Sequence, residues 1–144
     1  MIGIAPWVSV EPNKNSAAIL GNLPFSQGSV TFRIPTTVVP TGAGGILVFA
    51  WAILTGANSP FAYWHFISRP GVQRQNWFSM LIAGDPAGRS TTGNSQAFWL
   101  PMPADRLLTV TLFANDLASA TNRGEVEIHG YYPGSARRGR PVQR

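Results

Sequence analysis

Glu125, Glu127 and His129 form the clearest cluster of residues whose side chains could do chemistry. They occupy alternate positions of the sequence, and alternate side chains of a β-strand point to the same face of a sheet. Two carboxylates and an imidazole on one face could bind a cation. The same alternation is also typical of an ordinary solvent-exposed strand face, and this is the interpretation that we favour. We therefore predict no metal site and no cofactor.

The other carboxylates and the second histidine show no catalytic pattern. No two of them are forced into an acid–base pair, and the sequence has no G-x-S-x-G, H-E-x-x-H or phosphate-loop motif. The absence of cysteine excludes a thiolate nucleophile and a disulfide framework. We predict that the protein is not an enzyme, and we assign no catalytic residue. These dispersed groups are Glu11, His65, Asp85, Asp105 and Asp116.

Aromatic side chains are abundant and suggest a binding role. Trp51 lies in the longest apolar run of the chain, so we expect it in the core. Other aromatic residues are candidates for an exposed face that could pack against a protein or stack on sugar rings. A carbohydrate-binding module therefore stays open as an alternative. The candidate contact residues are Trp64, Trp77, Trp99, Tyr131 and Tyr132.

The last ten residues, SARRGRPVQR, form a basic arm after a single predicted domain at residues 1–134. The chain contains 11 Lys and Arg residues and has a net charge of +5, but four of these arginines lie in the last eight positions. The rest of the chain is nearly neutral, so the positive charge belongs to the arm. Its arginines could contact nucleic-acid phosphates or an acidic protein surface. Because Gly, Pro and Arg cannot order such a segment alone, we expect a partner chain to hold it. The arginines are Arg137, Arg138, Arg140 and Arg144.

The composition indicates one domain that is covered in part by partners. A chain of 144 residues is long enough to bury a core. Charged residues make up only 12% of it, compared with about 25% in typical soluble domains. The N-terminus does not resemble a secretory signal, and the run Ile46–Leu54 is too short for a membrane-spanning helix. We expect no membrane partner.

Alternating apolar and polar residues, punctuated by 12 prolines and 15 glycines, predict about eight strands and no long helix. Ile46–Leu54 is apolar on both faces and should be a central strand buried on two sides, although a helix is the alternative. A polar loop is expected at Arg89–Ser95. The pattern favours an all-β antiparallel sandwich, jelly-roll-like with extended termini, over an immunoglobulin-like one. The expected strands are Trp7–Val10 (continued by Ala17–Leu20), Ser29–Ile34, Ile46–Leu54, Phe61–Ser68, Asn76–Ala83, Gln96–Leu100, Leu108–Leu112 and Glu125–His129.

The short aromatic strands and the closing pattern, LLTVTLFAND followed by VEIHGYYP, give the chain its resemblance to known proteins. It resembles small jelly-roll virion structural proteins, such as phage capsid decoration, head-fibre or tail proteins. The closing pattern is similar to the last strands of compact trimeric sandwiches of the tumour-necrosis-factor and complement-like type. A GYYP ending also occurs in secreted bacterial β domains, which keeps the carbohydrate-binding alternative open.

The resemblance implies a virion subunit that is assembled in the host cytoplasm and packs against other virion proteins and copies of itself. A homo-oligomer is expected, with a trimer favoured and the arginine arm as a tether. A variant is a single-jelly-roll coat protein whose arm contacts the genome.

Overall fold

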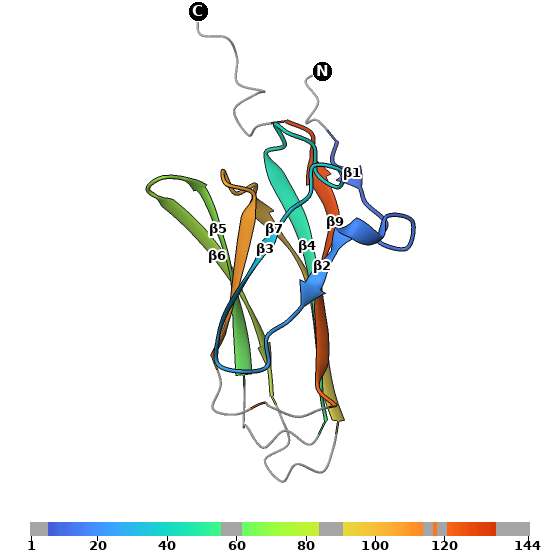
Figure 1. Cartoon of the computed structure of the whole chain (residues 1–144), viewed down its shortest axis with the longest axis vertical. Helices are drawn as coiled ribbons and strands as arrows, with labels where there is room; N and C mark the ends of the chain where they lie inside the picture. The colour runs from blue at the N-terminus through green and yellow to red at the C-terminus, as the bar shows by residue number, and fades with distance from the viewer. Residues whose placement is uncertain (1–5, 56–61, 84–90, 114–116, 118–120, 135–144) are drawn as a thin grey trace, which may run out of the picture.

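The computed structural model describes residues 6–55, 62–83, 91–113, 117 and 121–134. These residues form two antiparallel sheets that face each other as a β-sandwich (Figure 1). The predicted all-β sandwich is thus confirmed. Sheet I contains β1 (Val8–Ser9), β2 (Ile19–Asn22), β9 (Arg123–Tyr132), β4 (Gly45–Thr55) and β7 (Thr91–Pro101). Sheet II contains β3 (Gly28–Arg33), β8 (Leu107–Phe113), β5 (Ala62–Gly71) and β6 (Arg74–Ile82), and a 3-10 turn, η1 (Ser16–Ala18), precedes β2.

The strand order is that of a jelly roll. Sheet I has the order β2-β9-β4-β7, with β1 also paired to β9, and sheet II has the order β3-β8-β5-β6. The antiparallel pairs β2–β9, β3–β8, β4–β7 and β5–β6 nest one outside the next around the turn between β5 and β6. The chain is therefore one long antiparallel ribbon folded over into two sheets. This order matches the jelly-roll prediction rather than the immunoglobulin-like alternative.

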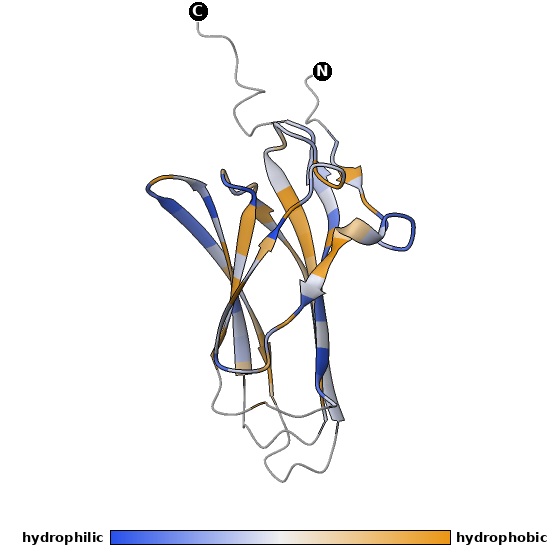
Figure 2. Ribbon diagram, viewed as in Figure 1, coloured by the Kyte–Doolittle hydropathy of each residue, from blue (hydrophilic) through white to orange (hydrophobic). Residues whose placement is uncertain are grey.

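Inward-facing side chains of the central strands fill the space between the sheets. Val48, Phe66, Val110 and Ile128, from β4, β5, β8 and β9, are fully buried. Burial of such apolar surface is the main term that favours folding. Trp64 also points inward, and its Nε1 donates a 2.9 Å hydrogen bond to the carbonyl oxygen of Pro24. Apolar and polar segments lie along both sheets in Figure 2.

Contacts between β6 and β7 close one side of the sandwich. The rings of Phe78 on β6 and Phe98 on β7 stack with their centroids 4.0 Å apart. Phe66 of β5 packs on the same Phe98 ring, at 4.9 Å. The Asn94 side chain donates a 2.5 Å hydrogen bond to the Leu81 carbonyl oxygen. The edge strands of the two sheets are therefore joined to each other.

Arg106 ties together two connections at the opposite end from Phe113. Its φ of 62° lies in the left-handed region, which is uncommon for a residue with a side chain. Its carbonyl oxygen accepts a hydrogen bond from Ile34 N, and its Nε donates to Ile34 O, both at 2.9 Å. Its Nη2 donates to Val39 O. The start of β8 thus holds the segment that links β3 to β4.

Two expectations need correction, one about where a strand begins and one about the burial of another strand. The expected loop at Arg89–Ser95 is wrong from Thr91 onward, because β7 pairs with β4 along its whole length, from Thr91 opposite Thr55 to Pro101 opposite Gly45. Threonine suits a strand, and an edge position tolerates its polar neighbours. The strand expected at Ile46–Leu54 is confirmed, and the helix is excluded. Its two-sided burial is wrong, because in the described part of the chain no further layer covers the outer face of sheet I.

Candidate functional site

The outer face of sheet II carries a cluster of exposed aromatic and aliphatic side chains. The Tyr63 and Phe113 rings stack with their centroids 5.0 Å apart. His65 lies 5.0 Å from each of these rings and is stacked parallel to Trp77 at 6.4 Å. Trp77, Leu81 and Phe113 are 60%, 57% and 38% exposed. We call this set the sheet II patch: Tyr63, His65, Trp77, Leu81 and Phe113.

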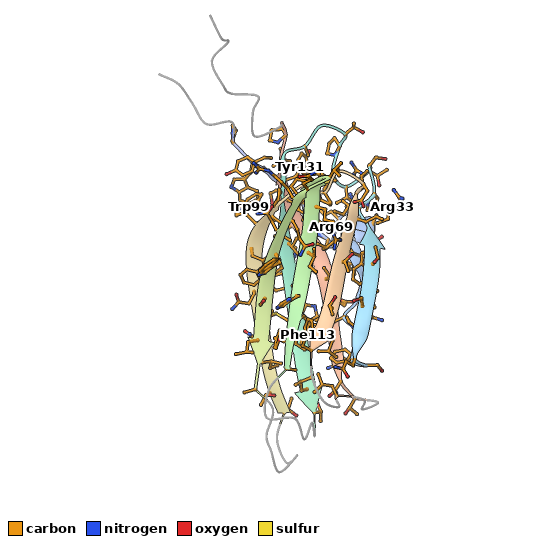
Figure 3. The ribbon with its side chains drawn as sticks, turned by 90° about the vertical axis from the view of Figure 1, so that its left-hand side faces the viewer. Arg33, Arg69, Trp99, Phe113 and Tyr131 are labelled. Atoms are coloured by element: carbon orange, nitrogen blue, oxygen red, sulfur yellow. The ribbon has the colours of Figure 1, made fainter. Side chains whose placement is uncertain are left out.

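Strand register explains why these residues meet. Tyr63 on β5 lies opposite both Leu81 on β6 and Phe113 on β8. Opposite residues of an antiparallel pair have Cβ atoms about 4.5–5.5 Å apart on the same face. His65 is the next outward residue of β5 and so borders Tyr63. Figure 3 looks onto this face, with Phe113 low on the sheet.

Hydroxyl side chains border the patch on β3 and β8. Ser29 Oγ and Thr111 Oγ1 are 2.7 Å apart, and Thr31 Oγ1 and Thr109 Oγ1 are 3.4 Å apart. Each hydroxyl therefore has a partner within the sheet. Burial of such a pair leaves fewer unmet hydrogen bonds than burial of separate hydroxyls would.

The charges of sheet II all have one sign. None of its four strands contains a carboxylate. Its arginines are Arg33 at the end of β3, Arg69 near the end of β5 and Arg74 at the start of β6. Arg33 and Arg69 lie at the end of the sheet opposite Phe113 (Figure 3). Sheet II thus presents an apolar end and a basic end.

The outer face of sheet I has its own aromatic cluster near β1. The Trp7 and Trp99 rings meet edge to face at 5.7 Å, and Trp99 lies 4.7 Å from Tyr132. A Cβ at Gly130 would lie 2.6 Å from the Trp7 ring. The Trp7 ring therefore packs against Gly130 of β9.

The Glu127–His129 pair lies next to this cluster on β9. His129 Nε2 is 2.8 Å from Glu127 Oε1, and the imidazole stacks on Phe49 at 4.6 Å. Glu125 takes no part in this pair. Among the described residues no three His, Asp or Glu side chains lie close enough to hold a metal ion. Asp85 and Asp116 lie outside the described residues.

Trp51 belongs to the outer face of sheet I, so its predicted place in the core is wrong. The inward residues of β4 are the even-numbered ones, such as Ala50 and Ala52, and they are buried. Trp51 is only half-buried and borders two surface hollows. The sequence could not show that Trp51 is exposed, because both faces of β4 carry apolar residues.

The predicted aromatic contact face is not one surface. Trp64 is fully buried, so its inclusion was wrong, whereas Trp77 and Trp99 are exposed on opposite sheets. Tyr131 packs against the core, and Tyr132 joins Trp99. The predicted arm residues Arg137, Arg138, Arg140 and Arg144 lie outside the described residues.

Sequence reasoning separated the two faces of β5 correctly but did not assign them. Its alternation places Trp64 and Phe66 on one face and Tyr63 and His65 on the other. Both faces are aromatic, so hydropathy alone could not show which one is outward. Pairing with Phe113 of β8 was the missing information.

Comparison of the sequence with protein-family models and with curated proteins gave no match. Within the described ranges, no helix has the length and apolarity needed to cross a membrane. The functional inference therefore depends on the geometry of the two outer faces.

Proposed function

We propose that this protein is a virion structural subunit that packs against other particle proteins, copies of itself included, through the outer face of sheet II. The observation that carries the proposal is the sheet II patch, an exposed aromatic cluster on one side of a jelly-roll sandwich. Jelly-roll sandwiches recur in viral capsid proteins. This part of the support is an analogy at the level of the fold.

Physical properties of the face support its burial in an assembly. Large exposed apolar patches on a folded domain usually mark interaction sites, and Trp and Tyr dominate the energetics of such contacts. A stable interface buries about 800 Å² per partner, which is more than five side chains provide. The contact would therefore extend over the hydroxyl pairs of β3 and β8, which already satisfy one another.

The charges indicate what the neighbouring surface must offer. Arg33 and Arg69 stand at one end of a sheet whose strands lack carboxylates. A partner surface that places acidic groups opposite this end would be steered into register. We favour a trimer or larger closed assembly, in which the patch of each subunit is covered by a neighbour.

The first test is the solution mass of the full-length chain, measured by light scattering, together with electron microscopy of the assembled species. We expect an oligomer, and we expect the double variant Trp77→Gln, Leu81→Gln to shift it toward the monomer. Both side chains are more than half exposed, so the change should leave the sandwich itself intact.

Val72→Gln is the matched control. Val72 is fully exposed in the turn between β5 and β6, so this variant also replaces an exposed apolar side chain with Gln in the same hairpin, but off the patch. It should assemble as the parent does. The proposal would be contradicted by a parent chain that is monomeric in solution. It would also be contradicted by a folded double variant whose oligomer has the same solution mass as that of the parent.

A further inference from the structure

A cross-strand row of four side chains crosses the outer face of sheet I. Trp51 of β4 lies opposite Ser95 of β7 on one side and Glu125 of β9 on the other. Glu125 in turn lies opposite Asn22 of β2. Neighbours in such a row have Cβ atoms about 5 Å apart. The sheet therefore aligns a hydroxyl, an indole, a carboxylate and an amide.

Two polar members of this row, Asn22 and Glu125, are available to a ligand, as is Arg123, which lies two residues before Glu125 on β9. In the described part of the chain, no hydrogen bond or ion pair engages the side chains of Asn22, Arg123 or Glu125. By contrast, Glu127, one outward position along β9, is paired with His129. Free hydrogen-bond donors and acceptors thus lie together on the side of Trp51 that faces β9 and β2.

The surface is hollowed on both sides of Trp51. A hollow of about 630 Å³ lies toward β9 and β2, where Asn22, Arg123 and Glu125 line it together with the apolar Leu23 and Phe25. A second hollow, of about 430 Å³, lies toward β7, where Ser95 lines it. Ligand sites for small molecules typically measure about 300–1,000 Å³ and combine apolar walls with a few placed polar groups.

We infer that the hollow lined by Trp51 and Glu125 binds a neutral pyranose unit of a glycan. One face of a pyranose ring presents C–H groups, which pack on an indole, while its rim presents vicinal hydroxyls. The Glu125 carboxylate accepts hydrogen bonds from two such hydroxyls, and charged acceptors form stronger bonds than neutral ones. Arg123 and Asn22 donate to the ring and hydroxyl oxygens.

The charges favour a neutral sugar over an anionic one. An acidic sugar or a phosphate would bring its charge beside Glu125, which offsets the attraction of Arg123. A purely apolar ligand would leave the carboxylate and the guanidinium without partners, which costs free energy. Because Trp51 borders both hollows, a disaccharide can contact both, and we expect it to bind more tightly than its monosaccharides.

Saturation-transfer-difference NMR on the full-length protein tests the inference. The probes are glucose, galactose, mannose, N-acetylglucosamine, lactose and maltose, with sialic acid as the anionic comparison. We expect saturation transfer to the ring protons of at least one neutral sugar. Glu125→Gln keeps the shape of the side chain and should weaken binding about tenfold. Trp51→Leu should abolish detectable transfer.

Phe49→Leu is the matched control, because Phe49 is the neighbouring outward residue of β4 and lines neither hollow. It should bind as the parent does. Circular dichroism confirms the fold of each variant. The double variant Trp77→Gln, Leu81→Gln, which should disrupt assembly, should still bind the sugar as the parent does. No transfer to any neutral sugar from the folded parent, or binding that survives both Trp51→Leu and Glu125→Gln, would overturn the inference.

Discussion

The single side chain of Arg106 joins two connections that are far apart in the sequence. It lies just before β8 and binds the segment that links β3 to β4. Its guanidinium donates to the carbonyl oxygens of Ile34 and Val39. Only an arginine can offer several donors in a fixed planar arrangement. A lysine at this position has one ammonium group and cannot reproduce both bonds in the same geometry.

Replacement of Arg106 by Met should lower the free energy of unfolding by about 2 kcal/mol, because hydrogen bonds from charged groups contribute roughly 1.5–3 kcal/mol. Methionine keeps the apolar stem of the side chain and removes its donors. Arg106→Lys should give an intermediate loss. The measurement is the urea midpoint at one fixed protein concentration.

Arg33→Met supplies the comparison for this prediction. Arg33 is exposed at the end of β3, so its replacement should change the free energy of unfolding by less than about 0.5 kcal/mol. Equal midpoints for Arg106→Met and Arg33→Met would show that the bonds to Ile34 and Val39 do not stabilise the fold.

The sequence could not identify Arg106, because its role depends on loops brought together by the folded ribbon. The same limit explains Trp51 and Trp64. Alternation shows which residues share a face, as in FAYWHFIS, but not which face of an aromatic strand points inward. The jelly-roll class was predictable because Gly and Pro turns separate short alternating segments. The hollow beside Trp51 was not predictable, since it requires the register of β2, β4 and β9.

At the scale of elements, β1 is the most weakly attached strand of sheet I. It contributes only two paired residues, Val8 and Ser9, to β9. A bulge in β9 at His129 shifts the register against β4 and brings Gly130 beneath Trp7. The absence of a side chain at Gly130 is therefore what lets the Trp7 ring approach β9 so closely.

Gly130→Ala should detach β1 from β9. The added Cβ would lie 2.6 Å from the Trp7 ring and 2.9 Å from the Val8 carbonyl oxygen, and overpacking of this kind costs about 1–3 kcal/mol. Amide hydrogen exchange should accelerate at Val10, whose N–H donates to His129 O. Exchange in β5 should stay slow.

Gly71→Ala serves as the control for Gly130→Ala, because a Cβ at Gly71 would meet nothing within 4 Å. It should leave exchange at Val10 unchanged. Slow exchange at Val10 in the Gly130→Ala protein would show that Trp7 can move aside without loss of β1.

In the whole molecule, the two proposed functions belong to opposite outer faces: assembly to sheet II and sugar binding to sheet I. Sheet II offers an aromatic surface with no carboxylate in its strands, whereas the outer face of sheet I carries Glu125 and Glu127. If subunits meet through sheet II, the hollow beside Trp51 stays open to solvent. The proposed assembly and the proposed sugar site are therefore compatible in one particle.

The arginine arm gives a further prediction at this scale. A chain that ends at Gly134 loses four of its 11 basic residues, and we expect it to keep the circular dichroism of the sandwich but to assemble less completely. Light scattering at equal concentrations measures the difference. Full-length protein with Arg137, Arg138, Arg140 and Arg144 all replaced by Gln separates the effect of charge from that of chain length.

Salt distinguishes the two roles considered for the arm. If four arginines bind phosphates, the logarithm of the affinity for nucleic acid should fall with the logarithm of the salt concentration with a slope of about −3 to −4. A protein tether should respond less steeply. If the chain that ends at Gly134 forms the same oligomer as the full-length chain, the arm is not a tether between subunits.

The position of β9 also determines when this protein can fold during its synthesis. β9 is the last described strand in the sequence, yet it lies between β4 and the strands β1 and β2 in sheet I. Until it leaves the ribosome, β4 lacks one neighbour and β1 and β2 lack their partner, whereas the β5–β6 hairpin can already form. Pairing of such distant segments is slow, and unpaired strand edges favour aggregation. A nascent chain must therefore keep the edge of β4 protected until β9 has left the ribosome.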